Sequence, residues 1–169
     1  LLSQKIQNLN GKTIGIIGKG SIGLRVAKLS KVFGMKVKFI SARNLKRIDF
    51  VKFLKNIDIL SIHCPLDKNT ENLITIKELR LMKKDSIIIN TARGGIVNEK
   101  DLVHALNKKI ISAAGIDVTT MEPPKKTHPY YKIINSPNFI WTPHTAWASD
   151  ETLKNALDQL IENINAYYL

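Results

Sequence analysis

Apolar residues along the chain gather into short runs, and stretches with a helical repeat separate these runs. Six runs are rich in Ile and Val and are bounded by Gly, Pro, Asn or Asp, which is typical of buried β-strands. They cover residues 13–17, 36–40, 58–62, 86–90, 112–118 and 139–141. Apolar positions recur at helical spacing in residues 22–33, 47–54, 76–81 and 99–107. The pattern predicts strands that alternate with helices.

This alternation predicts the architecture. Strands that alternate with helices and are apolar on both faces form parallel sheets with helices on both sides. We therefore expect an α/β fold over residues 1–169, with a doubly wound, Rossmann-type parallel sheet in three layers, α/β/α. A last helix, 150–167, carries one apolar stripe, formed by Leu153, Leu157, Leu160, Ile161 and Ile164. Residues 119–137 hold four of the six prolines and are expected to form a loop.

Composition and charge argue against several classes of protein. The 169 residues, 44% apolar and 24% charged, suffice for one globular domain with a core. No apolar run approaches the ~20 residues of a membrane span, and residues 1–10 lack the apolar block of a signal peptide. Cys64 is the single cysteine, so we expect a reducing, cytoplasmic setting. The net charge of +12 comes mostly from 21 scattered lysines, which does not favour nucleic-acid binding.

The first candidate for chemistry is the turn between the first strand and the first helix. It has the pattern Gly18-x-Gly20-x-x-Gly23. In dinucleotide-binding turns the first glycine makes the tight turn, the second admits the pyrophosphate, and the third lets the helix pack on the strand. The helix N-terminus then offers N–H groups to an anion. A structural turn without a ligand is the alternative.

The residues after the second strand bear on the choice of cofactor. A NAD site usually has an acidic residue there, which binds the ribose hydroxyls. Here the strand runs into Ser41 and Arg43, and residues 24–48 contain no acid. Because a hydroxyl and a guanidinium both bind phosphate, this local chemistry favours NADP(H) over NAD by a small margin. The alternative is that Arg43 is solvated and NAD binds without a carboxylate.

Four further residues follow later strands of the predicted sheet. Arg93 follows the fourth strand, Asp117 lies at the end of the fifth with Glu122 in the loop beyond, and His144 follows the sixth. Ligands of doubly wound sheets bind outside the carboxyl ends of the strands, so Arg93 is placed to bind a substrate carboxylate. Pairing with Glu122 would favour the charged form of His144, which could then protonate a carbonyl oxygen. Each residue alone is a weak signal; Arg93 is equally well explained as a surface arginine.

Several motifs together resemble one family. The glycine turn, HCPLDKNTENLI (63–74), NTARGGIVNE (90–99), GIDVTTMEPP (115–124) and TPHTAWAS (142–149) are similar to the nucleotide-binding domain of D-isomer-specific 2-hydroxyacid dehydrogenases. The resemblance runs from about residue 11 to residue 168. TPHTAWAS is most similar to the glycerate dehydrogenase (hydroxypyruvate reductase) members. Three features depart from the family pattern: the acid after the second strand is missing, Asp67 stands where threonine is usual, and Lys19 replaces an apolar residue in the glycine turn.

The resemblance implies an activity and a set of site residues. Hydride would pass between NAD(P)H and a small 2-oxo or 2-hydroxy acid, of the hydroxypyruvate, glycerate or glyoxylate type. Arg93 would bind the substrate, and His144 paired with Glu122 would be the acid/base. The expected cofactor-binding residues are Gly18, Gly20, Ser21, Ile22, Gly23, Ser41, Arg43, Cys64, Pro65, Thr70, Thr91, Ala92, Arg93, Asp117, His144 and Ala146. A cofactor-sensing protein similar to co-repressors is the alternative.

The resemblance also implies parts that the chain lacks. We expect a second, flavodoxin-like substrate domain in the full-length enzyme, and a homodimer. No metal site is expected, because the four histidines and Cys64 have no close-spaced ligand partners. In particular, His128 shows no partner in the sequence, and His104 is assigned to packing or to the surface. Trp147 is expected either to border the substrate or to pack in the core.

Overall fold

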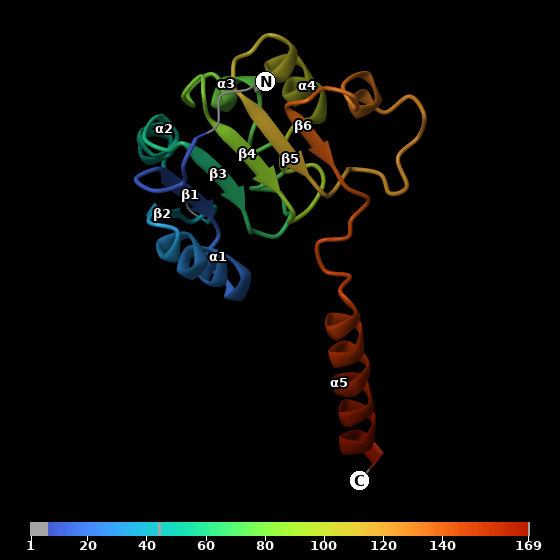
Figure 1. Ribbon diagram of the computed structural model, residues 1–169. Coiled ribbons are helices and arrows are strands. Elements are labelled where there is room, and N and C mark those ends of the chain that lie inside the picture. The colour runs from blue at the N-terminus through green and yellow to red at the C-terminus, as the bar shows by residue number, and fades with distance from the viewer. Residues whose placement is uncertain (1–6, 44, 169) are drawn as a thin grey trace.

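The computed structural model describes residues 7–43 and 45–168. Its centre is one six-stranded parallel sheet (Figure 1), which confirms the predicted doubly wound α/β fold. The strands are β1 (Thr13–Ile17), β2 (Lys36–Ile40), β3 (Ile59–Ile62), β4 (Ile87–Asn90), β5 (Ala113–Ile116) and β6 (Phe139–Trp141). Their order across the sheet is β2-β1-β3-β4-β5-β6, and every neighbouring pair is parallel.

The helices follow the predicted alternation. They are α1 (Ser21–Val32), α2 (Arg47–Lys55), α3 (Ile76–Leu79), α4 (Glu99–Asn107) and α5 (Asp150–Tyr168). Helix α3 is shorter than the predicted 76–81, although Thr75 and Glu78 form a capping box at its start. The proline-rich loop contains a 3-10 turn, η1 (Pro129–Lys132), which the sequence pattern did not indicate.

Two apolar clusters lie on opposite faces of the sheet, and the smaller one reaches only the strands β1, β2 and β3. Helix α1 packs on one face, where Ile14 and Ile16 of β1 are buried with Ala27. The larger cluster lies on the other face and includes Ile17 and Leu54. Residues 14, 16 and 17 fall on the two faces because successive strand residues point to opposite sides. The core thereby fixes the carboxyl edge of the sheet, where the candidate site residues lie.

Helix α5 forms as expected, but its apolar stripe has no partner within the described chain. Figure 1 shows α5 extending away from the sheet. None of its described residues is buried, and Leu157 is 59% exposed. The stripe pattern predicts which residues share a face but not what covers that face.

Candidate active site at the carboxyl edge of the sheet

The glycine turn has the geometry of a phosphate cradle. Gly18 has φ +101°, and a Cβ there would lie 2.3 Å from the carbonyl oxygen of His63. A Cβ on Gly23 would lie 2.5 Å from the carbonyl oxygen of Gly18. A Cβ on Gly20, in contrast, would meet nothing within 4 Å. Packing within the chain thus explains the first and third glycines, while the second leaves open space.

The start of α1 beside Gly20 is suited to an anion. Gly20 is the N-cap residue, makes no side-chain cap, and is followed by a first turn without an acidic residue. No carboxylate of the described residues is bonded to the N–H groups at this helix end, and the helix dipole favours negative charge there. Ser21 and Ile22 of this turn are exposed. These residues fit a dinucleotide phosphate.

The carboxyl end of β2 lies next to this turn. The N–H of Gly18 donates to the carbonyl oxygen of Ile40 at 3.1 Å, which brings Ser41 and Arg43 close to the glycines. Both are exposed, and Ser41 Oγ accepts the N–H of Arg43 at 3.2 Å. Arg43 lines a cavity of about 1010 Å³ that also carries Asp67 and Glu71. Lys19 extends to the same strand, with Nζ 5.5 Å from the ring centroid of Phe39.

The segment after β3 forms a turn that its own side chains stabilise by hydrogen bonds. Thr70 is buried, and its hydroxyl donates to the carbonyl oxygen of Pro65 at 2.8 Å. Asp67 Oδ1 accepts the N–H of Asn69 at 2.7 Å and that of Thr70 at 3.1 Å. The aspartate that departs from the family pattern thus stabilises this turn. Burial raises the pKa of the Cys64 thiol to about 11, so Cys64 is not a ready thiolate.

Arg93 lies on the loop after β4, which the buried Asn90 shapes. Asn90 Nδ2 donates to the carbonyl oxygen of Arg93 at 2.9 Å, and Asn90 Oδ1 accepts the N–H of Ala92 at 3.1 Å. The Arg93 side chain is exposed and is available for an external anion at this edge of the sheet. The cavity beside it is about 540 Å³ and is lined by Ile22, His63, Cys64, Pro65, Leu66, Thr91, Ala92 and Arg93.

Asp117 holds the loop that carries His144. Its carboxylate accepts the N–H groups of Thr145 and Ala146, each at 2.9 Å, and the hydroxyl of Thr142. Its carbonyl oxygen accepts the N–H of His144 at 2.8 Å. Burial opposes ionisation, but the hydrogen bonds from Thr142 and the two amides hold the pKa of Asp117 below its ordinary value. Asp117 is therefore an ionised organiser of this loop.

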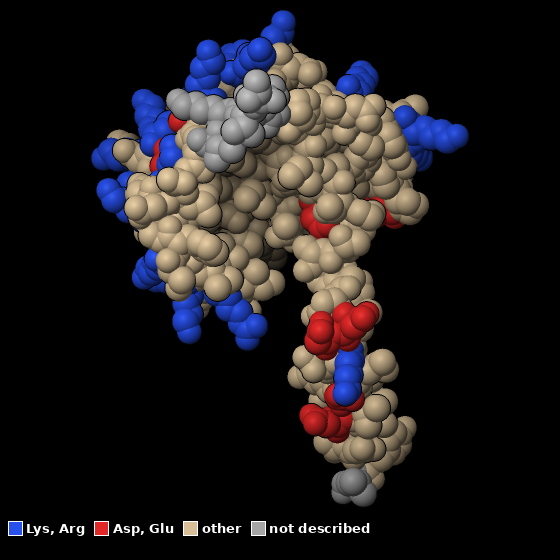
Figure 2. All heavy atoms as spheres, viewed as in Figure 1, with Lys and Arg blue, Asp and Glu red and all other residues tan. Residues whose placement is uncertain are grey.

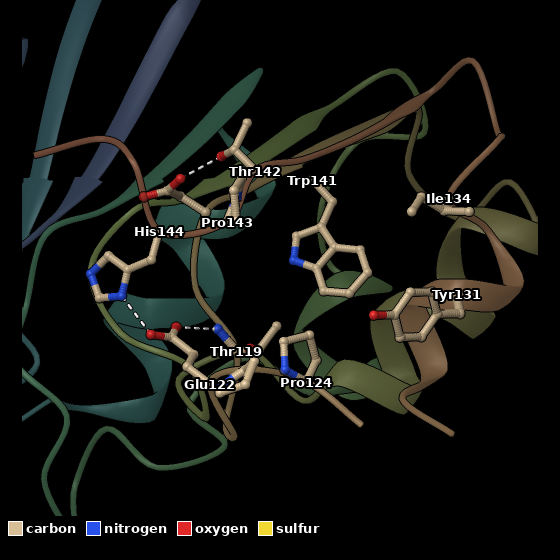
Figure 3. Close-up of a pocket in the computed structure, with 11 residues that line it drawn as sticks. Thr119, Glu122, Pro124, Tyr131, Ile134, Trp141, Thr142, Pro143 and His144 are labelled. Atoms are coloured by element: carbon tan, nitrogen blue, oxygen red, sulfur yellow. Dashed lines mark hydrogen bonds and ion pairs between the residues drawn. The ribbon is translucent and has the colours of Figure 1, made fainter. Parts of the chain in front are cut away.

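His144 and Glu122 form a close His–carboxylate pair at this edge of the sheet. His144 Nδ1 lies 2.5 Å from Glu122 Oε2, and Figure 3 shows the two side chains facing each other. The other oxygen of Glu122 accepts the N–H of Thr119 at 2.9 Å. His144 has φ +54°, a strained conformation for a residue with a Cβ, and such strain is common at functional sites.

The charge state of Glu122 supports this pairing. Burial raises its pKa, yet the hydrogen bonds from Thr119 and His144 outweigh burial and leave the pKa of Glu122 below its ordinary value. The two side chains are about one-third exposed, so the pair is accessible. It borders a cavity of about 480 Å³ (Figure 3), whose far wall includes Tyr131, Ile134 and Trp141.

The structure brings some of the expected residues together and separates others. Glu122 and His144 are in direct contact, whereas Arg93 lines a different cavity, on the loop of a neighbouring strand. Within the described residues, no group of three or more His, Cys, Asp or Glu side chains is placed to hold a metal. Trp147 is 54% exposed, so packing in the core was wrong for it. His104 lies on the surface.

Two histidines have neighbours that the sequence did not reveal. The interpretation of His128 as a residue without a partner was wrong: its Nε2 lies 2.8 Å from Glu99 Oε2. The partners are 29 residues apart and share no local motif, so only the fold brings them together. His63 Nε2 lies 2.8 Å from Ser61 Oγ, and His63 lines the same cavity as Arg93. Burial lowers the pKa of His63, which favours its neutral form.

Surface charge separates α5 from the rest of the chain. In Figure 2, basic side chains lie at several separate places on the sheet-containing part, and acidic side chains gather on α5. Helix α5 contains Asp150, Glu151, Asp158 and Glu162 against one basic residue, Lys154. The basic residues visible in this view thus form no continuous patch. No helix among the described residues is both long and apolar enough to cross a membrane.

Fold and site together define a dinucleotide-binding α/β domain with a His–Glu pair at the carboxyl edge of its sheet. The chain belongs to the D-isomer-specific 2-hydroxyacid dehydrogenase family, because the model of that family's NAD binding domain matches residues 2–146. A glycerate dehydrogenase of Methylorubrum extorquens is 40% identical over 96% of this chain and 52% of its own length. A glyoxylate reductase of Aeropyrum pernix is 40% identical over 94% of this chain and 49% of its own length.

Solved structures show the same fold. The NAD-complexed form of a D-isomer-specific 2-hydroxyacid dehydrogenase from Lactobacillus delbrueckii has a TM-score of 0.82 and 30% identity, over 93% of this chain and 54% of that one. An acyclic imino acid reductase in complex with NADPH and D-Arg has a TM-score of 0.83 and 34% identity, over 99% of this chain and 56% of that one. The chain spans about half the length of the curated relatives that it matches.

Proposed function

We propose that this chain is the cofactor-binding domain of an oxidoreductase that transfers hydride between a nicotinamide dinucleotide and a small 2-oxo or 2-hydroxy acid. The observation that carries the proposal is the 2.5 Å contact between His144 and Glu122, at the same edge of the sheet as a glycine turn with open space at Gly20. A proton donor for a carbonyl oxygen and a cradle for a cofactor phosphate are the two parts that such a reaction needs.

The protein side chains have separate tasks in this proposal. Arg93 binds the carboxylate and carbonyl of the oxo acid and orients them. His144 gives its proton to the carbonyl oxygen, and ionised Glu122 holds the ring through Nδ1 and stabilises its charged form. Asp117 keeps the loop of His144 in place through Thr145 and Ala146. The bound nicotinamide supplies the hydride.

The cofactor would be held along the carboxyl edge of the sheet. Gly18, Gly20, Ser21, Ile22 and Gly23 would surround the pyrophosphate. The expected residues nearer the nicotinamide are Thr91, Ala92, Arg93, Asp117, His144 and Ala146, with Cys64 and Pro65 between the two groups. Since the Thr70 hydroxyl is bonded inside its turn, Thr70 would shape the site through the backbone.

Ser41 and Arg43 would recognise the 2′-phosphate of NADP(H). Both are exposed beside the glycine turn, and no acidic residue occurs between positions 24 and 48. Their hydroxyl and guanidinium are donors suited to phosphate, whereas a carboxylate at this position would repel it. NAD binding without a carboxylate remains the competing choice.

The rest of the enzyme would complete the site. We propose a second, substrate-binding domain outside this chain, against which the apolar stripe of α5 would pack. The lack of buried residues in α5 and the half-length match to the relatives support this division. A homodimer and a cytoplasmic location are the expected setting.

The test is an assay of the full-length protein with NADH and with NADPH, using hydroxypyruvate and glyoxylate as substrates. We expect absorbance loss of the reduced cofactor with one of the two acids. His144→Gln should remove most of it, because general acid–base catalysis contributes about 10²- to 10⁴-fold. Cofactor binding without turnover of any 2-oxo acid would contradict the proposed enzyme activity and favour a cofactor-sensing protein.

A further inference from the structure

One carboxylate ties the loop of Glu122 to the first turn of α4. Glu99 Oε1 accepts the N–H of Thr120 at 2.7 Å, and Glu99 Oε2 accepts the Thr120 hydroxyl at 3.0 Å. The two residues are 21 positions apart in sequence. The Glu99 side chain is only 11% exposed, so water competes little for these bonds.

A buried histidine fixes the same carboxylate from the other side. His128 Nδ1 accepts the N–H of Tyr130 at 3.3 Å, which assigns the ring proton to Nε2. Nε2 then donates to Glu99 Oε2 at 2.8 Å. The His128 ring also stacks on Trp141, with 5.6 Å between the centroids, and Trp141 lines the cavity beside Glu122. Glu99 therefore has little freedom to leave Thr120.

The loop passes this constraint to Glu122. Thr119 precedes Thr120, and its N–H donates to Glu122 Oε1 at 2.9 Å. The Thr119 hydroxyl donates to the carbonyl oxygen of Met121 at 2.9 Å, which closes the turn that leads from Thr119 to Glu122. With Oε1 occupied in this way, Oε2 is the oxygen that faces His144.

We propose that Glu99 is a positioning residue for the Glu122–His144 pair. It acts through Thr120 and Thr119 and touches neither substrate nor cofactor. The inference rests on the proposed function, in which Glu122 and His144 are the acid/base pair. It predicts that the rate of the chemical step depends on a carboxylate at the start of α4.

The pH profile offers a readout that a merely structural role would not move. Two titratable groups act on Glu122: His144, which lowers the pKa of Glu122, and Asp117, which raises it. The N–H of Thr119 is a further contribution that lowers the pKa of Glu122. If loss of Glu99 loosens Thr119, the pKa of Glu122 rises, and the acid limb of kcat moves to higher pH.

The experiment compares Glu99→Ala, Glu99→Gln and Thr120→Val in the full-length enzyme, with Glu122→Gln as reference. Asp85→Ala, an exposed carboxylate before β4 at the opposite edge of the sheet, is the control. We expect Glu99→Ala to lower kcat about tenfold or more with little change in KM, as a displaced catalytic group does. Thr120→Val should lose less. Glu99→Gln should recover part of the loss, because its amide oxygen can accept the Thr120 N–H.

The outcomes separate the alternatives. Wild-type kcat and an unmoved acid limb in Glu99→Ala would overturn the inference. If Glu99→Ala does not fold, wild-type kcat and an unmoved acid limb in both Glu99→Gln and Thr120→Val would overturn the inference. A loss of kcat with a matching rise in KM and no change in the pH profile would mean a structural role only. Wild-type behaviour of Glu122→Gln would instead reject the proposed function of Glu122, and the positioning role with it.

Discussion

Gly94 and Thr119 are packed so closely that a Cβ on Gly94 would lie 2.0 Å from the carbonyl carbon of Thr119. Gly94 follows Arg93, and the N–H of Thr119 binds Glu122. The bare backbone at Gly94 therefore sets how closely the loop of the proposed anion-binding arginine approaches the loop of the proposed acid/base pair.

Gly94→Ala should disturb this spacing. Because the contacted atoms are backbone, neither loop can yield by changing a rotamer, and one loop must move. We expect kcat/KM for the oxo acid to fall at least about tenfold, since small displacements of positioned groups are costly. Steady-state kinetics of the full-length enzyme measures this. Gly115→Ala is the matched control, because a Cβ there meets nothing within 4 Å. Equal activity of the two variants would contradict the role of Gly94.

Within the glycine turn, Gly18 is required by packing, whereas Gly20 leaves space for a ligand. Gly20→Ala should lower the free energy of unfolding of the apoprotein by about 1 kcal/mol or less, because a Cβ there meets no protein atom and only the N-cap preference for glycine over alanine is lost. It should weaken NADH and NADPH binding about tenfold or more, because the methyl group would occupy the space left for the phosphates. Isothermal titration calorimetry and urea unfolding measure the two quantities. Unchanged cofactor affinity in Gly20→Ala would show that Gly20 does not contact the cofactor phosphates.

Gly18→Ala should behave in the opposite way. Its φ of +101° and the close His63 carbonyl make any side chain strained, so we expect a loss of stability of about 1–3 kcal/mol. An unchanged urea midpoint would mean that the turn can rearrange.

Much of the fold could be predicted from the sequence because the strands are short apolar runs between helical stretches, although only β1 and β3 are buried on both faces. The β1, β2 and β6 ranges match the expected residues, and the β3 and β4 strands begin one residue later than expected. Asp58 and Ser112, placed in strands by the pattern, lie just before β3 and β5 and still donate backbone N–H bonds to neighbouring segments. The β5 strand ends at Ile116, two residues before the expected end, and the carboxylate of the next residue, Asp117, binds the loop after β6.

Only those site residues that belong to a recognisable sequence motif could be predicted. Glu122 and His144 were expected from their places after β5 and β6, and the structure joins them. Glu99 and His128 carry no such signal, because each looks like an ordinary polar residue of a helix start and a loop. Their contact depends on the path of residues 119–137, which have no periodicity from which to predict it.

Arg43→Asp tests the choice of cofactor. If Ser41 and Arg43 bind the 2′-phosphate, the variant should lose NADPH affinity about tenfold or more, since a carboxylate repels phosphate and instead suits ribose hydroxyls. NADH affinity should rise or stay equal. Fluorescence titration with each cofactor measures both. Arg80→Asp, which changes the net charge equally at the end of α3, is the control. An unaltered ratio of the two affinities would leave NAD as the cofactor choice.

Asp117 should make stability depend on pH with a defined sign. Its pKa is lower in the folded protein than its ordinary value, because hydrogen bonds outweigh burial. Such a carboxyl stabilises the fold above the unfolded-state pKa, and this contribution is lost as pH falls through the lower, folded-state pKa. Urea unfolding of wild type and Asp117→Asn should therefore differ most above about pH 4. The difference should shrink at more acidic pH; a difference that grows there would mean that the pKa is raised.

The stripe of α5 should matter only in the complete protein. Leu160 is 55% exposed in this chain, although it lies in line with Leu153, Leu157, Ile161 and Ile164. If a second domain covers the stripe, Leu160→Asp should destabilise the full-length protein by about 2 kcal/mol or more, because it buries a carboxylate and removes an apolar contact. In the 169-residue chain the same variant should have almost no effect on unfolding. Asn155→Asp, on the opposite side of the helix, controls for added charge. Equal effects of the two variants in the full-length protein would show that the stripe stays in solvent.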